Sequence, residues 1–188
     1  MIDLTRFDHV AFAVRDLAAA ARLYGDALGG QLVRGGDDTD IGIRTLQFKY
    51  PPGVKVELLE PIGDSYLARH IDRHGEGFHH VTVFVEDLES AIEELRSRGF
   101  DLIDIELVLD TWKEAFLRPR ATFGSLIQLV STSLDDWGEP VEGMTIDSVL
   151  NGEWRWINNR CVPRSEVERL GLRNIRPPKA FANRRSPK

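Results

Sequence analysis

Two segments of the chain, residues 7–20 and 78–91, repeat each other without a gap. Half of the aligned positions are identical at a constant offset of 71: Phe7/Phe78, His9/His80, Val10/Val81, Val14/Val85, Asp16/Asp87, Leu17/Leu88 and Ala20/Ala91. Self-similarity at one fixed offset is the signature of a duplicated structural unit. The sequence therefore predicts two copies of one module, which should pack in equivalent ways.

Each copy follows the same order of expected elements. An apolar, β-branched strand leads to an aspartate, Asp16 or Asp87, that suits a helix N-cap because its carboxylate accepts hydrogen bonds from free backbone N–H groups. Apolar residues then recur at helical spacing until glycines at 29–30 and at 99 end each helix. Three shorter strands complete each unit, at 31–34, 43–50 and 54–59 in the first copy and at 102–105, 113–118 and 125–130 in the second.

These elements predict an α+β fold with two tandem βαβββ modules, which form a cleft-shaped, barrel-like mixed sheet, and a C-terminal extension. The predicted units are a main domain over 1–134, with module one at 5–61, a linker at 62–76 and module two at 77–131, and a basic extension over 135–188. We expect the extension to wrap the body because Trp154 and Trp156 need burial. Its end, with Pro177-Pro178 and Arg184–Lys188, is expected to be frayed.

Composition restricts the possible metal ligands and the expected localisation of the protein. Cys161 is the only cysteine, so no intramolecular disulfide can form and any metal must be held by nitrogen and oxygen ligands. No segment approaches the ~20 consecutive apolar residues of a membrane-spanning helix. Residues 1–12 also lack the features of a signal peptide, so we expect a cytoplasmic protein with no membrane partner.

The net charge of −6 is unevenly distributed. Residues 151–188 carry ten Lys and Arg against three acids, which makes this tail +7 and the rest of the chain −13. A basic arm for nucleic acid or for an anionic substrate would explain the split. A tail that folds back on its own acidic body explains it without a partner, and we favour that interpretation over nucleic-acid binding.

Four polar side chains recur inside the apolar strands at a matched spacing. His9 lies 48 positions before Glu57, and His80 lies 48 positions before Gln128. If the modules pack about a pseudo-twofold axis, these side chains converge on one cleft, where they suit one divalent ion: Co, Ni, Mn, Zn or Fe. A lone strand histidine is more often a core residue, and alternation can turn Glu57 and Gln128 to solvent. The repetition, and the cost of burying a carboxylate, favour a shared metal site.

Three other histidines are assigned no role in this site. His79 adjoins His80 and should face the opposite side of the sheet by strand alternation. His70 and His74 fall in the linker, where we expect them to be solvated or paired with acids. The predicted metal site therefore contains two imidazoles.

The segments around these residues resemble the vicinal oxygen chelate (glyoxalase/bleomycin resistance/dioxygenase) superfamily, and within it the methylmalonyl-CoA epimerases, over roughly residues 5–131. The similar segments, in order, are Asp8-His-Val-Ala, Val56-Glu-Leu-Leu-Glu-Pro61, Gly75-Glu-Gly-Phe-His-His-Val81, Phe116-Leu-Arg-Pro119 and Gly124-Ser-Leu-Ile-Gln-Leu129. The resemblance implies that His9, Glu57, His80 and Gln128 bind one divalent metal ion of unknown identity.

The resemblance also implies a metal-dependent isomerase or epimerase that abstracts a proton α to a carbonyl through a metal-bound enolate, with Glu57 as the catalytic residue. The implied substrate is a small molecule, such as an acyl-CoA thioester. A homodimer is expected because dimerisation is common among such proteins.

The chain departs from the family pattern at several positions. The last strand carries Gln128 where the family usually has Glu, and Thr45 lies where some epimerases carry a second glutamate proposed as a base. Inversion of a carbon is simplest with two bases, and only Glu57 is evident. We expect Arg44, Thr45, Arg118 and Arg120 to contact the substrate, because guanidinium groups bind carboxylate and phosphate. The alternative is that these arginines are solvated charges at strand ends.

Three other functions stay open for a chain of this pattern. His9, His80 and Glu57 are a ligand set that non-haem Fe(II) dioxygenases use. A glyoxalase-like lyase is a second alternative, although both it and the dioxygenase are disfavoured by the loss of the last-strand Glu. A non-catalytic small-molecule binding or resistance protein is the third. Retention of four metal ligands favours an enzyme over that third function.

Overall fold

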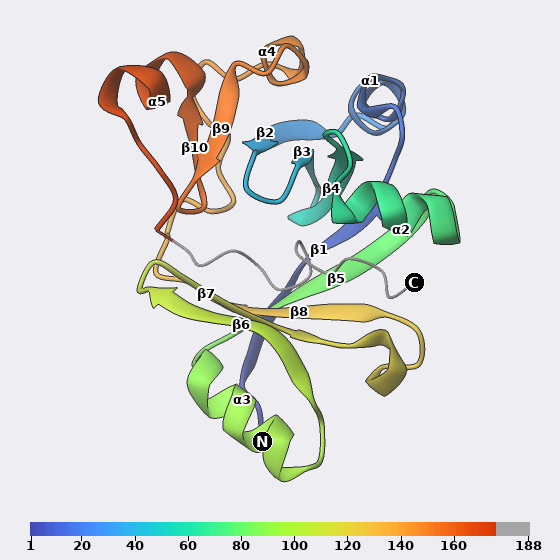
Figure 1. The fold of residues 1–188 in the computed structure, drawn as a ribbon, viewed down its shortest axis with the longest axis vertical. Coiled ribbons are helices and arrows are strands. Elements are labelled where there is room, and N and C mark those ends of the chain that lie inside the picture. The colour runs from blue at the N-terminus through green and yellow to red at the C-terminus, as the bar shows by residue number, and fades with distance from the viewer. Residues whose placement is uncertain (176–188) are drawn as a thin grey trace.

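The computed structural model describes residues 1–175, which form one ten-stranded sheet in the order β10-β9-β2-β3-β4-β1-β5-β8-β7-β6 (Figure 1). The strands are β1 (Leu4–Ala13), β2 (Gln31–Asp38), β3 (Ile43–Tyr50), β4 (Val54–Pro61), β5 (Gly77–Val85), β6 (Leu102–Leu109), β7 (Trp112–Leu117), β8 (Leu126–Ser131), β9 (Trp154–Ile157) and β10 (Arg160–Pro163). The α+β class is confirmed, and the curved sheet stays open. The expected frayed end at residues 177–188 lies outside the described residues.

Strand pairing confirms the duplication. β1 pairs in parallel with β4, where Ala11 lies opposite Glu57, and β5 pairs in parallel with β8, where Thr82 lies opposite Gln128. Both pairs keep the offset of 71. The two modules meet where β1 and β5 run antiparallel at the centre of the sheet. A pseudo-twofold axis between these two strands therefore relates module one to module two.

The helices flank the sheet (Figure 1). They are α1 (Leu17–Ala21), which continues into a π-helical segment (Arg22–Ala27), α2 (Tyr66–His74), α3 (Leu88–Ser97), a 3₁₀ turn (Pro119–Ala121), α4 (Ile146–Leu150) and α5 (Arg164–Leu170). Both expected N-caps form, since Asp16 accepts a hydrogen bond from Ala19 N at 2.8 Å and Asp87 accepts one from Ser90 N at 3.1 Å. None of the helices within residues 1–175 is long and apolar enough to span a bilayer.

Each module has its own apolar core. In module two, α3 buries Leu88, Ile92 and Leu95 against the sheet. In module one, α1 packs on β3 and β4, and Val149 and Trp154 from the extension are buried in the same core. Burial of one such side chain is worth about 1.5–3 kcal/mol, so the extension contributes directly to the stability of module one.

The linker holds a helix that the sequence pattern did not predict. α2 begins after the N-cap Ser65 and buries Leu67 and Ile71 against module one. This amphipathic packing fixes the linker against the sheet. His70 and His74, on the same helix, therefore lie at the edge of the central cavity. His70 is partly buried there, whereas His74 is exposed, as expected.

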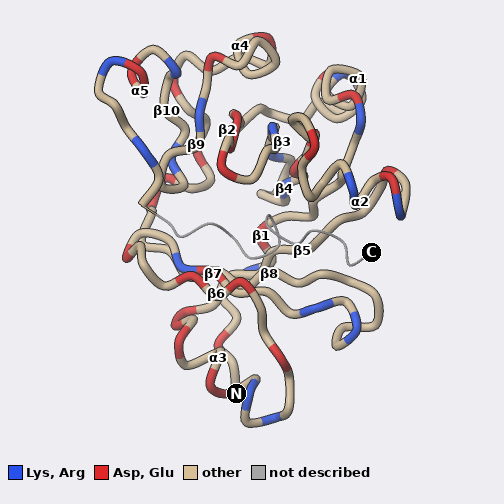
Figure 2. The backbone as a smooth tube through the Cα atoms, viewed as in Figure 1, with Lys and Arg blue, Asp and Glu red and all other residues tan. Residues whose placement is uncertain are grey.

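The extension adds β9 and β10 to the free edge of β2, with Arg155 opposite Asp37. Its basic residues lie among acidic ones (Figure 2). Within the described residues, Arg155 pairs with Asp37 at 2.8 Å, Arg160 with Asp136 at 3.8 Å and Arg164 with Glu168 at 2.7 Å. These contacts agree with a basic tail that folds back on acidic groups of its own chain.

Candidate metal centre

Three ligand side chains converge from three adjacent strands. His9 on β1, Glu57 on β4 and His80 on β5 each offer an atom, and these atoms all lie within 4.8 Å of one another. Glu57 Oε2 is 3.4 Å from His9 Nε2 and 3.8 Å from His80 Nε2. Metal–ligand bonds of about 2.0–2.2 Å place neighbouring ligand atoms about 3–3.5 Å apart. The spacing therefore leaves room for one ion after small side-chain adjustments.

Two β-bulges aim the histidines. The β1–β5 pairing has three register shifts, and at the two beside the histidines the extra residues are Asp8 and His79, which are repeat equivalents at the offset of 71. Asp8 Oδ2 lies 2.8 Å from His9 Nδ1, and His79 Nδ1 lies 2.8 Å from His80 Nδ1. Because each Nδ1 is engaged, each Nε2 is left to face Glu57.

Two expectations about the other histidines are overturned, and the bulge at His79 explains the first. His79 was expected on the opposite face from His80, but both line the central cavity because the bulge interrupts the strand alternation. His70 was expected in solvent or beside an acid, and its ring centroid instead lies 4.8 Å from that of His79. Burial lowers the pKa of both His70 and His79, so these imidazoles are neutral at neutral pH.

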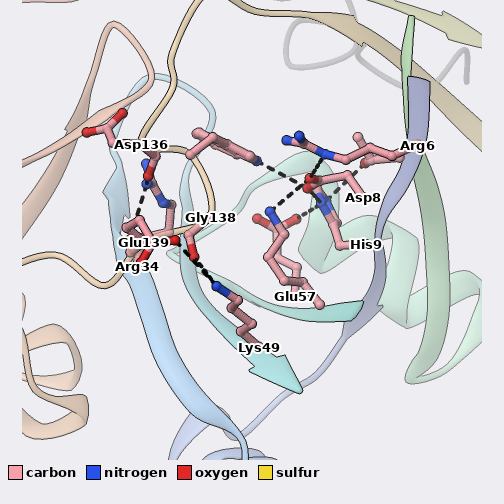
Figure 3. Close-up of polar contacts among 12 residues, drawn as sticks. Arg6, Asp8, His9, Arg34, Lys49, Glu57, Asp136, Gly138 and Glu139 are labelled. Carbon is pink, nitrogen blue, oxygen red and sulfur yellow. Dashed lines mark hydrogen bonds and ion pairs between the residues drawn. The ribbon is translucent and has the colours of Figure 1, made fainter. Parts of the chain in front are cut away.

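Asp8 connects the site to the surrounding fold (Figure 3). Its Oδ1 lies 2.8 Å from Lys55 Nζ and 3.0 Å from Arg6 Nε, and its Oδ2 accepts a hydrogen bond from Trp137 Nε1 at 3.1 Å. Burial alone would raise the pKa of Asp8, but its contacts with His9 and Lys55 hold that pKa well below the usual range. The carboxylate therefore stays ionised and fixes the His9 ring.

The charge on His9 depends on Glu57 and Asp8. Burial lowers its pKa, but the Glu57 charge and the hydrogen bond to Asp8 outweigh burial and raise the pKa to about 9. A metal ion must displace the Nε2 proton to bind, and metal binding of this kind releases protons. His9 Nε2 also lies 3.0 Å from Thr82 Oγ1.

The site opens into a cavity of about 640 Å³. Its wall includes aromatic residues from both modules, the linker and the extension: Tyr66, Phe78, Trp112, Phe116, Trp137 and Trp156. A volume of this size accommodates a small organic molecule.

Gln128, the fourth expected ligand, lines the same cavity. Its Oε1 accepts a hydrogen bond from Thr82 Oγ1 at 2.6 Å, and its Nε2 donates one to Glu114 Oε2 at 2.6 Å. Sequence reasoning missed Glu114 and Thr82. The signal for Glu114 was present, since it is an acid within the apolar strand Trp112–Leu117.

The four expected substrate-binding residues lie in different settings. Thr45 lines the cavity and accepts a hydrogen bond from Trp156 Nε1 at 2.8 Å. The three arginines are not among the lining residues. Arg44 pairs with Asp37 at 2.6 Å, and Arg120, largely exposed, lies 3.2 Å from Asp101. Arg118 has a buried Nε that forms no hydrogen bond within residues 1–175.

Residues 8–116 match the model of the Glyoxalase/Bleomycin resistance protein/Dioxygenase superfamily. The chain belongs to this superfamily. Among its members, the Ethylmalonyl-CoA/methylmalonyl-CoA epimerase of Cereibacter sphaeroides is 33% identical over 129 residues, which are 66% of this chain and 96% of that protein. The mitochondrial methylmalonyl-CoA epimerase of Homo sapiens is 30% identical over 131 residues, 68% of this chain and 74% of that protein.

Solved structures of the superfamily share the fold. The methylmalonyl-CoA epimerase of Mycobacterium tuberculosis superposes with a TM-score of 0.63 at 31% identity, over 70% of this chain and 90% of that one. A Streptomyces coelicolor methylmalonyl-CoA epimerase in complex with 2-nitronate-propionyl-CoA superposes with a TM-score of 0.61 at 25% identity, over 70% of this chain and 100% of that one.

Proposed function

We propose that this chain is a metal-dependent epimerase that removes and returns the proton α to the carbonyl of an acyl-CoA thioester. The observation that carries the proposal is the convergence of His9, Glu57 and His80, whose ligand atoms lie within 4.8 Å of one another. Similarity to proteins named methylmalonyl-CoA epimerases, one of them bound to an acyl-CoA analogue, supports the reaction and the substrate class.

The donor set fits one divalent ion. Two imidazole nitrogens and a carboxylate oxygen suit Co, Ni, Mn, Zn or Fe, and the Gln128 amide oxygen would join them by turning away from Thr82. A bound ion would supply Lewis-acid chemistry, which polarises the thioester carbonyl and makes the α-proton more acidic. Asp8 and His79 would hold the two imidazoles in place.

Glu57 is the proposed proton acceptor. Its carboxylate lies on the cavity wall beside both imidazoles, and its side chain is only 14% exposed. A substrate carbonyl that lies between His9 and His80 would bring its α-carbon within reach of Glu57. Transfer of that proton breaks the C–H bond and leaves the electron pair delocalised into the carbonyl as an enolate.

We further propose that the described part of the extension, residues 135–175, belongs to the active-site unit with the main domain, residues 1–134. Trp137 and Trp156 from the extension form part of the cavity wall, and Trp156 contacts the proposed substrate-binding residue Thr45. The relatives described above align with 66–70% of this chain. Because Trp137 and Trp156 shape the pocket, we propose that the acyl group of this chain's substrate differs from the acyl groups that these relatives bind.

The test is exchange of the α-proton. Purified protein, stripped with chelator and reloaded with Co, Ni, Mn, Zn or Fe, is incubated in D₂O with methylmalonyl-CoA and other α-branched acyl-CoA thioesters, and the α-proton signal is followed by NMR. We expect loss of the signal only with metal present. If no thioester exchanges with any metal, the proposal is wrong.

A second candidate function follows from the same three ligands, because two imidazoles and one carboxylate are the set that activates oxygen in non-haem Fe(II) enzymes. Oxygen uptake by the Fe(II)-loaded protein with a catechol would favour that function.

A cytoplasmic homodimer also remains a proposal. Light scattering on the purified protein measures its oligomeric state.

A further inference from the structure

Each module has two polar residues on adjacent strands that line the cavity. Thr45 pairs with Leu59 across β3–β4, and Glu114 pairs with Val130 across β7–β8. Leu59 and Val130 are related by the offset of 71. Thr45 and Glu114 therefore occupy the same place in the two modules, as Glu57 and Gln128 do one strand away.

Each module thus has one acid and one neutral polar residue at this pair of positions, but the acid lies on the last strand in module one and on the strand before it in module two. Module one has Glu57 on β4 with Thr45 on β3, and module two has Glu114 on β7 with Gln128 on β8. In the sheet order β4-β1-β5-β8-β7, the two histidine strands lie between the two glutamate strands. Both glutamates line the cavity, so their carboxylates approach it from opposite sides of His9 and His80.

Glu114 is firmly held in this position. It is 2% exposed, and its Oε2 accepts hydrogen bonds from Gln128 Nε2 at 2.6 Å and from Trp112 Nε1 at 3.1 Å. Burying a carboxyl group costs free energy that a neutral residue would avoid. Three other acids also line the cavity: Asp38, Glu76 and Asp104. Asp38 lies on β2, farther from the histidine strands, Glu76 is exposed, and Asp104 lies on the outermost strand β6 and is less buried than Glu114. Glu114 is therefore the better placed group.

We infer that Glu114 is the second catalytic acid–base group of this site, an inference that rests on the proposed epimerase function. Inversion needs a proton to leave one face of the α-carbon and another to arrive at the opposite face. Glu57 accepts the proton from one face as the C–H bond breaks. Glu114, in its protonated form, donates its proton to the other face as the new C–H bond forms. In the reverse direction the two glutamates exchange roles, and exchange with solvent resets both.

The experiment compares wild type with Glu114→Gln, supplying each epimer of methylmalonyl-CoA separately in D₂O with the metal that supports exchange in the wild type. We expect epimerisation to fall by about 10²–10⁴-fold, the usual contribution of a general acid or base. One epimer should still exchange its α-proton with retention, through Glu57, while the other should not. Metal content and melting temperature should match those of wild type, because Gln preserves the shape of the side chain.

The matched control is Glu106→Gln. Glu106 is also a buried glutamate, 5% exposed, and it pairs with Glu114 across β6–β7, but it does not line the cavity. This variant should exchange both epimers. Equal losses in the two variants would overturn the inference, as would wild-type epimerisation by Glu114→Gln or a selective loss in Asp104→Asn. If wild type exchanges no thioester, the proposed function itself fails and the inference falls with it.

Discussion

Asp8→Asn is the substitution that most sharply probes how the fold supports the site. The Asp8 side chain is fully buried and contacts Lys55, Arg6, His9 and Trp137. Lys55 is only 4% exposed, so neutralising Asp8 leaves an ammonium group buried without its counter-charge. Breaking a buried pair in this way costs about 3–5 kcal/mol. Arg6 is half exposed, and loss of its pair should add less than about 1 kcal/mol.

The same substitution should weaken metal binding, because Asp8 orients His9 through Nδ1. Changes in such supporting groups typically lower metal affinity by about 10–100-fold. Urea unfolding of chelated protein measures the stability loss, and calorimetric titration with metal measures the affinity. Arg6→Ala is the control, and it should stay near wild type in metal affinity.

A double variant separates charge from shape. Asp8→Asn combined with Lys55→Met removes both charges, so most of the lost stability should return while the metal affinity stays low. Stability of Asp8→Asn within about 1 kcal/mol of wild type, the range of a surface pair, together with unchanged metal affinity, would refute the role assigned to Asp8.

Three further outcomes are expected. His80→Ala should lose the bound metal, as measured by elemental analysis, while the chelated protein stays folded; full metal content would contradict the site. Deletion of residues 135–188 should abolish cooperative thermal unfolding, because Val149 and Trp154 belong to the core of module one, and an unchanged melting curve would argue against that packing. Thr45→Val removes the acceptor for Trp156 Nε1 and should cost about 1–3 kcal/mol in urea unfolding with metal content retained; loss of metal would assign Thr45 a different role.

The duplication made most of the fold predictable from sequence. One constant offset identified both modules, and the strand registers keep that offset at His9, Glu57, His80 and Gln128. The α2 helix was missed although its sequence is amphipathic, because residues 62–76 match neither copy of the repeat and were therefore interpreted as a linker.

The bulges could not be predicted, because alternation assigns Asp8 and His79 to the face away from their neighbours. The bulge at each of these residues interrupts the alternation, so each side chain lies beside that of the following histidine. These bulges are seen only in the pairing between β1 and β5. Glu114 was missed for a different reason. The connection between β3 and β4 differs in length from that between β7 and β8, so its equivalence with Thr45 appears only in the strand registers.

The most direct test of the account is calorimetric titration of chelated protein with Co, Ni, Mn, Zn and Fe(II), for wild type and for His9→Ala. The account predicts binding of one ion per chain to wild type and loss of that binding in His9→Ala, because His9, Glu57 and His80 supply the ligands. Absence of binding to wild type, or equal binding to both proteins, would contradict it.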